Sequence, residues 1–510
     1  MALTIDLTLA DVRAYTSCTV VPIAARILAD STTPINVLRA LQTESSHCYV
    51  LESAEQQHTW GRYTFLGYKP CEEVTAKNGV VHHRIFDEKE AVVHTASSEE
   101  PPRAVVEEIL ARFRAPTRPD LPPFTGGLVG YFGYDYVRYA EPQLVLDAAD
   151  EEGFNDLDLM LFDTVVCFDH YRQEIVVIAH VQIPENDEDS SALEAGYAAA
   201  VAKIEHIVDL IRSNRRADIV PGVVTSDFRA LLDEERFCAM VEKAQWSIRE
   251  GDIFQVVLSN RLDADFEGSL LNTYRYLRTI NPSPYMFYFS SDDMEVAGAS
   301  PETLVKLHDG VLHTFPLAGT RARIVGDDAQ NERLERELLA DEKELAEHNM
   351  LVDLGRNDLG KISRFGSVQV EEYLQLQRFS HVVHLGSTVR GEIRSSDDPG
   401  GKATAMDAIE AVLPAGTLSG APKLRAMQII NDLEDNKRGI YGGAIGYIDF
   451  TGNLDTAIGI RLAYKKNGKV FVRSGAGIVL DSVPTHEYRE CINKARAVVT
   501  AIQKSQEVAE

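Results

Sequence analysis

Two pairs of glutamates occur at a spacing of three residues in distant parts of the chain. Glu344 and Glu347 lie in the segment 341–348, and Glu487 and Glu490 lie near the end of the sequence. On a helix, side chains three positions apart share a face, so each pair presents two carboxylates in one direction. Two such helices facing each other would offer hard oxygen ligands of the kind that suit Mg²⁺. A single E-x-x-E is more often a solvated helix face.

Two segments of small residues have the composition of anion-binding loops. Residues 414–423, PAGTLSGAPK, place Thr417 shortly before an expected helix start, where backbone N–H groups commonly hold negative groups. Residues 474–478, SGAGI, follow a strand-like run, and Gly475 and Gly477 allow a backbone to approach a ligand closely. This G-x-G lacks the spacing of a dinucleotide fingerprint or a P-loop. Taken alone, a tight turn explains it equally well.

The composition is globular but strongly acidic. Hydrophobic residues make up 45% of the 510 residues and charged residues 25%, with a formal net charge of −27. Binding to nucleic acid requires clustered Lys and Arg that neutralise phosphates, so we expect no nucleic-acid partner. An anionic substrate would meet a repulsive field, and local donors or a metal ion would have to offset it.

The sequence carries no signal for a membrane or for an oxidising compartment. No apolar run approaches the roughly 18 to 20 residues that a bilayer span requires, and the N-terminus lacks the pattern of a cleaved leader. The six cysteines are scattered without a CxxC pair, which disfavours a zinc ribbon or a disulfide framework. We therefore expect a cytoplasmic protein without membrane contact.

The elements that must position these groups differ on the two sides of a Pro-Gly turn at residues 221–222. Residues 1–222 mix short strand-like runs with turns, and an acidic stretch at 185–189 is expected to be an exposed loop. Residues 223–510 alternate strand-like and helix-like segments. Because strands outnumber the possible crossover helices, we expect an α+β protein with antiparallel sheets and helices packed outside them.

Periodicity and composition predict where these elements lie. Helices are expected at 192–212, 234–249, 332–354, 403–412, 423–433 and 487–503. Strands are expected at 48–53, 127–133, 164–169, 174–182, 253–258, 285–289, 295–299, 441–450, 456–464 and 470–474.

Taken together, these segments resemble the chorismate-utilising enzyme family over roughly residues 234–501. The matched strings are IFQVV at 253–257, ASPE at 299–302, PLAGTR at 316–321, AEH at 346–348, LVDLGRNDLG at 351–360, GTLSGAPK at 416–423, YGG at 441–443 and GAGI at 475–478. So many ordered strings make a chance match implausible. The resemblance implies a four-layer α/β/β/α fold, in which two orthogonally packed antiparallel sheets carry helices on their outer faces.

Two positions indicate the branch of the family that the chain resembles. Isochorismate and salicylate synthases carry a lysine at the position of Gln255, and that lysine activates water. A glutamine cannot act as a base at neutral pH, so addition of water is disfavoured here. Aminodeoxychorismate synthases usually carry a lysine at the position of Ala318. The resemblance therefore implies amination of chorismate at C2 by ammonia, followed by pyruvate elimination to give anthranilate. Aminodeoxychorismate synthase component I is the alternative.

The resemblance also assigns roles to individual residues. Mg²⁺ would be bound by Glu347 and Glu490, supported by Glu344 and Glu487. The residues that would bind chorismate are Gly319, Thr320, Tyr441, Arg461, Gly475, Ala476 and Gly477. The residues that would act in catalysis are Glu302 as the acid for the departing C4 hydroxyl, His384 in the elimination, Thr417 and Gln255. A lone histidine such as His384 would otherwise be taken for a core residue.

A feedback site for tryptophan is implied by the strings LES at 51–53 and NPSPYM at 281–286. Its residues would be Glu52, Ser53, Pro284, Tyr285 and Met286. Glu52 suits the ligand's ammonium group, and the other side chains suit an indole ring.

No cysteine lies in a strand–turn–helix nucleophile elbow, so the chain has no recognisable glutamine amidotransferase. Ammonia is expected from a separate glutamine amidotransferase subunit, in a hetero-oligomer of both subunits. A non-catalytic amino-acid sensor that has kept the fold is a rival from another class. Loss of a metal glutamate or of His384 would favour it, and all of these residues are present.

Overall fold

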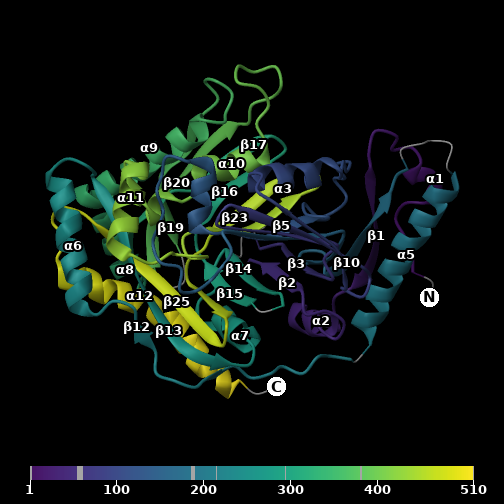
Figure 1. The fold of residues 1–510 in the computed structure, drawn as a ribbon, viewed down its shortest axis with the longest axis horizontal. Coiled ribbons are helices and arrows are strands. Elements are labelled where there is room, and N and C mark those ends of the chain that lie inside the picture. Colours follow the sequence, from purple (N-terminus) through teal and green to yellow (C-terminus); the bar gives the residue numbers. More distant parts are fainter. Residues whose placement is uncertain are drawn as a thin grey trace.

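Two large antiparallel sheets lie face to face and form the centre of the molecule, as the computed structural model shows (Figure 1). The structure describes residues 3–53, 61–184, 190–213, 215–292, 294–324, 326–378 and 382–508. The acidic stretch 185–189 lies outside the described residues.

The first sheet has 13 strands in the described part of the chain. Its order is β1 (Val20–Leu28), β10 (Glu174–Gln182), β9 (Thr164–Asp169), β3 (Tyr63–Tyr68), β2 (Cys48–Glu52), β14 (Tyr285–Ser290), β15 (Met294–Ser300), β24 (Leu462–Lys466), β25 (Lys469–Ile478), β13 (Gln255–Glu267) and β11 (Val223–Val224). Two further strands pair with β13, namely β12 (Arg229–Ala230) and β21 (Gly420–Ala421).

The second sheet has 12 strands in the same described ranges. Its order is β18 (Leu317–Ala322), β20 (Val382–Glu392), β17 (Val311–Thr314), β16 (Thr303–His308), β23 (Leu454–Ile458), β22 (Ala444–Asp449), β7 (Gly127–Phe132), β8 (Leu157–Phe162), β4 (Glu72–Lys77), β5 (Val80–Phe86) and β6 (Val92–Ser98). The remaining strand, β19 (Gln369–Arg378), pairs with β20.

Alternating side chains give strand β10 of the first sheet two buried faces. In β10, Ile175 and Val177 belong to a core on the helix side, whereas Val176 and Ile178 belong to a core between the sheets. Since successive side chains of a strand point to opposite faces, a strand buried on both faces is apolar at nearly every position. This is why residues 175–179, IVVIA, form a continuous apolar run.

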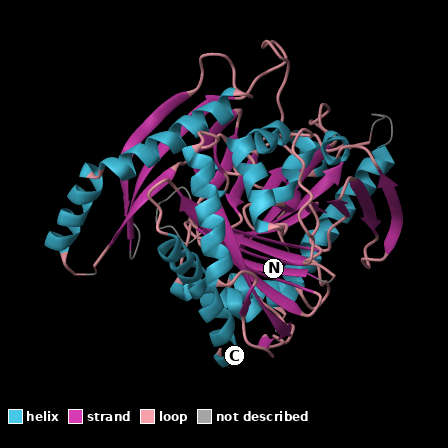
Figure 2. Cartoon of the chain, turned by 60° about the vertical axis from the view of Figure 1, so that its left-hand side comes forward, coloured by secondary structure: helices cyan, strands magenta, loops and turns pink. Residues whose placement is uncertain are grey.

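Helices cover the outer face of each sheet, as Figure 2 shows by colour. The helices over the first sheet are α2 (Pro34–Leu41), α5 (Ser190–Arg212), α6 (Glu234–Arg249), α7 (Leu271–Ile280), α11 (Lys423–Glu434) and α12 (Pro484–Lys504). Those over the second are α3 (Pro102–Ala111), α8 (Asp328–Ala340), α9 (Glu342–Gly360) and α10 (Ala405–Val412). Short helices occupy connections: α1 (Leu9–Val12), η1 (Tyr134–Tyr136), α4 (Val137–Ala140), η2 (Gly416–Leu418) and η3 (Ser505–Glu507). The predicted fold class of antiparallel sheets flanked by helices is confirmed.

Two predicted elements prove to be two elements each. The helix expected at 332–354 is interrupted at Asp341, which ends α8 and whose carboxylate accepts hydrogen bonds from the backbone N–H groups of Lys343 and Glu344 to start α9. The strand expected at 456–464 is also interrupted, because β23 lies in the second sheet and β24 in the first. The crossing between the sheets places Arg461 at a φ of 52°.

Strands from both sides of residue 222 share each sheet. In the first sheet β2 pairs with β14, and in the second β7 pairs with β22. The division of the chain into 1–222 and 223–510 therefore stays a prediction from the sequence pattern. Among the described residues, the helices are too short or too polar to cross a membrane.

Candidate active site

A cavity of about 510 Å³, hereafter the first cavity, gathers nearly all of the residues expected to act in catalysis. Its walls come from β13, β18, β20, β25, α9, α12 and η2. The expected residues that line it are Gln255, Glu302, Gly319, Thr320, Glu344, Glu347, His384, Thr417, Tyr441, Arg461, Gly475, Gly477, Glu487 and Glu490. Ala476 does not line it: its side chain lies on the opposite face of β25, fully buried in an apolar core with Leu258.

The four glutamates come from two helices. Glu344 and Glu347 lie in the first turns of α9, and Glu487 and Glu490 lie in the first turns of α12. Burial and then the charge of Glu344 raise the pKa of Glu347. Burial also raises the pKa of Glu487, to which the charge of Glu490 contributes. The two carboxylates of each helix therefore repel each other.

These carboxylates fit Mg²⁺ by chemistry, although they are not gathered around a point. Within the described ranges, no three acidic, histidine or cysteine side chains converge closely enough to hold a metal ion. Glu490 instead pairs with Lys494 at 2.7 Å, and Glu344 pairs with Arg321 at 3.1 Å. Mg²⁺ needs only one or two protein carboxylates and keeps waters and substrate as its other ligands, so the donor set is sufficient.

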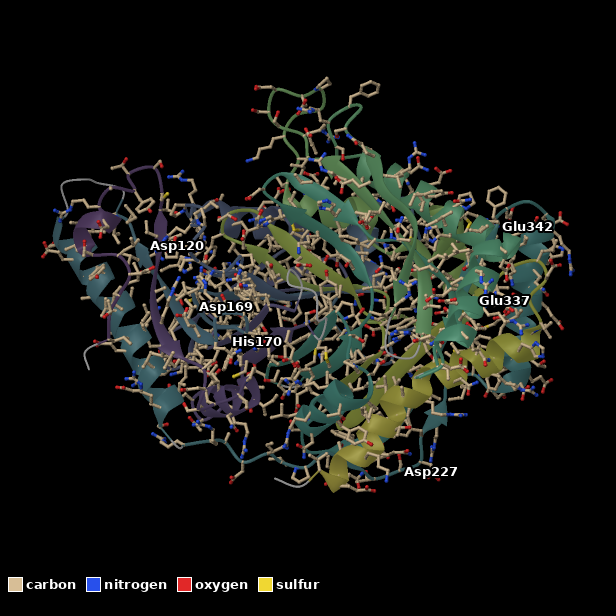
Figure 3. All side chains as sticks on the ribbon, turned by 180° about the vertical axis from the view of Figure 1, so that it is seen from behind. Asp120, Asp169, His170, Asp227, Glu337 and Glu342 are labelled. Carbon is tan, nitrogen blue, oxygen red and sulfur yellow. The ribbon has the colours of Figure 1, made fainter. Side chains whose placement is uncertain are left out.

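By contrast, Glu337 and Glu342 are exposed on α8 and α9 and do not line the cavity. Figure 3 shows both at the periphery of the molecule. The E-x-x-E pattern thus selects the inward face of α9, while other glutamates of the same segment are ordinary surface residues.

Burial brings the pKa of Glu302 close to neutral pH. Thr417 Oγ1 donates a hydrogen bond to Glu302 Oε1 at 3.0 Å. Desolvation of the carboxyl group raises the pKa of Glu302 to about 7, against the opposing effects of Thr417 and of the Arg461 charge. A substantial fraction of this carboxyl group is therefore protonated near neutral pH.

His384 has a defined tautomer. Its Nδ1 lies 2.9 Å from the carbonyl oxygen of Gly319 and 3.1 Å from Thr320 Oγ1. Because a carbonyl oxygen only accepts, Nδ1 carries the proton of the neutral ring and Nε2 carries the lone pair. Burial lowers the pKa of His384, so the neutral ring is favoured, and Nε2 is the atom that can take up a proton.

The glycines of β25 are needed for close packing inside the first cavity. A Cβ atom at Gly475 would lie 2.9 Å from the Tyr441 hydroxyl, and one at Gly477 would lie 2.7 Å from Gln255 Nε2. The amide of Gln255 also donates to Glu347 Oε1 at 3.5 Å. Gln255 therefore connects the glycine strand to a predicted metal ligand.

A second cavity of about 360 Å³ lies between the two sheets. All of the residues expected at the feedback site line it: Glu52, Ser53, Pro284, Tyr285 and Met286. The pairing of β2 with β14 sets Glu52 opposite Met286, which explains why strings more than 200 residues apart in the sequence meet here.

The carboxylate of Glu52 already has partners in this structure. Arg278 Nε lies 2.5 Å from Glu52 Oε1, and the hydroxyl of Tyr274 donates to the same oxygen. Both partners belong to α7. A ligand's ammonium group at Glu52 would therefore compete with Arg278.

Sequence reasoning missed several residues of both cavities. Lys494 lines the first cavity and is four residues after Glu490, so the spacing of i and i+4 on a helix could have revealed it. Lys306 and Asp455 line the second cavity and form an ion pair at 3.2 Å. Their strands, β16 and β23, pair only in the folded sheet, and no local pattern marks them.

Comparisons with known proteins show to which family the chain belongs. Residues 46–500 match the family described as chorismate binding enzyme. The chain is 42% identical over 498 residues to anthranilate synthase component 1 of Acetivibrio thermocellus, with 96% of each chain covered. It is 40% identical over 514 residues to anthranilate synthase component 1 of Aquifex aeolicus, with 99% of each covered.

Solved structures show the same fold. Anthranilate synthase component I from Streptococcus pneumoniae TIGR4 superposes with a TM-score of 0.72 at 36% identity, over 92% of this chain and 98% of that one. The menaquinone-specific isochorismate synthase of Escherichia coli shares the fold with a TM-score of 0.67 at 20% identity, over 97% and 99% of the two chains. The profile match over most of the chain, and relatives of this identity over nearly its full length, show that the chain belongs to the family of chorismate binding enzymes.

Proposed function

We propose that this protein is the chorismate-converting component of an anthranilate synthase, which aminates chorismate and eliminates pyruvate from the product. The observation that carries the proposal is the meeting of Glu302, His384, Gln255 and two glutamate pairs in one cavity. The names of the relatives support it.

Binding of the dianionic substrate would draw on both walls of the first cavity. Arg461 would pair with the enolpyruvyl carboxylate, because a guanidinium group matches a carboxylate in two parallel hydrogen bonds. Backbone N–H groups around Gly475 and Gly477, and the Tyr441 hydroxyl, would complete that end. Gly319 and Thr320 would contact the ring.

Glu347 and Glu490 would hold Mg²⁺ near the ring carboxylate, with Glu344 and Glu487 in support. The ion, when bound, supplies positive charge that neutralises the carboxylates and orients the substrate. Lys494 and Arg321, which pair with Glu490 and Glu344 in this structure, would release these carboxylates.

Glu302 would act as the acid of the first step. Ammonia forms a bond to C2, the ring double bonds shift, and the bond from C4 to its hydroxyl oxygen breaks. Hydroxide is a poor leaving group, so the proton of Glu302 passes to that oxygen and water departs. The hydrogen bond from Thr417 fixes the carboxyl group for this transfer.

His384 would serve the second step. The ring proton at C2 must leave as the enolpyruvyl group departs as pyruvate, and the ring becomes aromatic. Nε2 of the neutral imidazole is the available base, because Nδ1–H is held by the carbonyl of Gly319. Aminodeoxychorismate synthase, the alternative, would place the amino group at C4 and retain the enolpyruvyl group, so it would need no such elimination.

Ammonia would come from a separate glutamine amidotransferase, and tryptophan would bind in the second cavity as an inhibitor. The apolar walls of that cavity, with charged groups at Glu52, Lys306 and Asp455, suit an aromatic amino acid.

The test is a fluorescence assay for anthranilate with purified protein, chorismate, Mg²⁺ and ammonium at alkaline pH, with and without tryptophan. We expect anthranilate to form and tryptophan to suppress it. Chorismate consumed without anthranilate would reject the proposal, and analysis of the product would then distinguish aminodeoxychorismate from isochorismate. No consumption at all would favour the non-catalytic sensor.

A further inference from the structure

A buried arginine lies beneath the wall of the first cavity. Arg438 follows α11 and is 1% exposed, which places it among the largest fully buried side chains of the described residues. It does not line the cavity itself. Its guanidinium group makes four hydrogen bonds.

Two of these hydrogen bonds go to backbone carbonyl groups of cavity-lining residues. Nη1 donates to the oxygen of Leu418 at 2.6 Å, and Nη2 donates to the oxygen of Val257 at 2.7 Å. Leu418 follows Thr417 in η2, and Val257 is two residues after Gln255 in β13. One planar group therefore bridges the segments that carry Thr417 and Gln255, in addition to the direct backbone hydrogen bond from Val257 N–H to the oxygen of Ser419 at 2.9 Å.

The face of the Arg438 guanidinium group packs near Tyr441, which belongs to a third wall of the first cavity. The guanidinium carbon of Arg438 lies 5.9 Å from the ring centre of Tyr441 and 4.6 Å from that of Tyr134. Tyr441 is 3% exposed and lines the first cavity. Contact with the cation adds to the apolar packing of the Tyr441 ring.

Glu434 neutralises the charge of Arg438. Its carboxylate accepts from Arg438 Nε at 2.9 Å and from Nη2 at 2.5 Å, and also from the backbone N–H of Ser259 at 2.7 Å. Such a buried ion pair is weak evidence of a role in stability, because apolar residues of similar volume often stabilise a fold as well or better. The guanidinium group of Arg438 also donates from Nη1 and Nη2 to carbonyl groups on two different cavity walls, which indicates a role in positioning those walls.

We propose that Arg438 is a positioning residue of this active site: its guanidinium group holds Thr417, Gln255 and Tyr441 in a fixed relative geometry through Leu418, Val257 and the Tyr441 ring. This inference rests on the proposed function. The inference requires an arginine at this position, since a lysine would keep the charge beside Glu434 but could not span the two carbonyl groups.

The experiment compares Arg438→Lys with Arg261→Lys in the anthranilate assay with free ammonium. Arg261 is a matched control, because it is 5% exposed, lies in β13 and pairs with Glu152 at 3.2 Å, yet does not line the cavity. We expect Arg438→Lys to lower kcat by roughly 10- to 100-fold, since small misplacements of reacting groups have effects of this size. KM for chorismate should change less than kcat, and Arg261→Lys should show no such split.

Thermal unfolding and tryptophan binding at the second cavity report whether each variant folds. Glu434→Gln, which keeps the shape but weakens the hold on Arg438, should lower kcat in the same direction. Equal kinetics of the two lysine variants would overturn the inference, and so would failure of both Arg438→Lys and Glu434→Gln to fold. A wild-type protein that forms no anthranilate would instead reject the proposed function.

Discussion

Glu52 and Arg278 form an ion pair of 2.5 Å that connects the second cavity to α7. Tyr274 of the same helix donates to the same carboxylate. Helix α7 packs against α12, the helix that carries Glu487 and Glu490. A ligand that draws Glu52 away from α7 would therefore act on a helix that packs against α12, whose residues line the first cavity, and this gives the proposed feedback inhibition a physical route.

Replacing Arg278 by glutamine should tighten tryptophan binding several-fold, because the ligand's ammonium group would no longer compete with a guanidinium group for Glu52. Calorimetric titration of the free protein measures the affinity. Arg275→Gln, on the same helix, is the control and should change the affinity less. Weaker binding in the Arg278 variant would mean that this side chain contacts the ligand directly.

Replacing either Glu347 or Glu490 by glutamine should lower turnover by roughly 100-fold or more, since a bound Mg²⁺ contributes several kcal/mol of charge stabilisation. The dependence of rate on Mg²⁺ concentration should shift to higher concentration in any residual activity. Glu342→Gln is the control, because Glu342 is exposed on α9 outside the cavity. Wild-type turnover in both cavity variants would reject these two ligands.

The sequence was sufficient for residues that sit in local patterns. The apolar runs of β10 and β14, the pairs of glutamates and the glycines of β25 can all be recognised from spacing and residue type, and the elements around them lie close to the predicted positions. The prediction of one helix at 332–354 was wrong because helix-forming residues continue through the break between α8 and α9. Asp341 is nevertheless a good N-cap and marks the start of α9.

Other site features depend on contacts between segments far apart in the chain. The crossing at residues 459–461 between the two sheets gives Arg461 its conformation, and no local pattern distinguishes it from a continuous strand. Arg278 and Arg438 are likewise ordinary arginines in the sequence. Only the folded chain brings them to Glu52 and to the carbonyl groups of Leu418 and Val257.

The raised pKa of Glu302 predicts a pH dependence. Its pKa of about 7 in the folded protein lies above its usual value of 4.5, so the protonated acid is present below pH 7 and is lost as the pH rises through 7. With free ammonia held constant, kcat/KM for chorismate should therefore fall above about pH 7. Glu302→Gln should lower the rate by about 10²- to 10⁴-fold and remove this limb from the profile. If kcat/KM of the variant still fell at the same pH, the titration would belong to another group.

Replacing Gly477 by alanine should weaken chorismate binding without unfolding the protein. The new Cβ would lie 2.7 Å from Gln255 Nε2. Because the end of a flexible side chain can move, Gln255 would shift away from Glu347 while the strand stays in place. Steady-state kinetics should show KM for chorismate raised by about 10-fold, the effect of roughly 1.4 kcal/mol, with little change in Tm. Gly360→Ala is the control, because a Cβ there meets no atom within 4 Å. A wild-type KM in Gly477→Ala would show that neither the Gly477 backbone nor the position of Gln255 governs substrate binding.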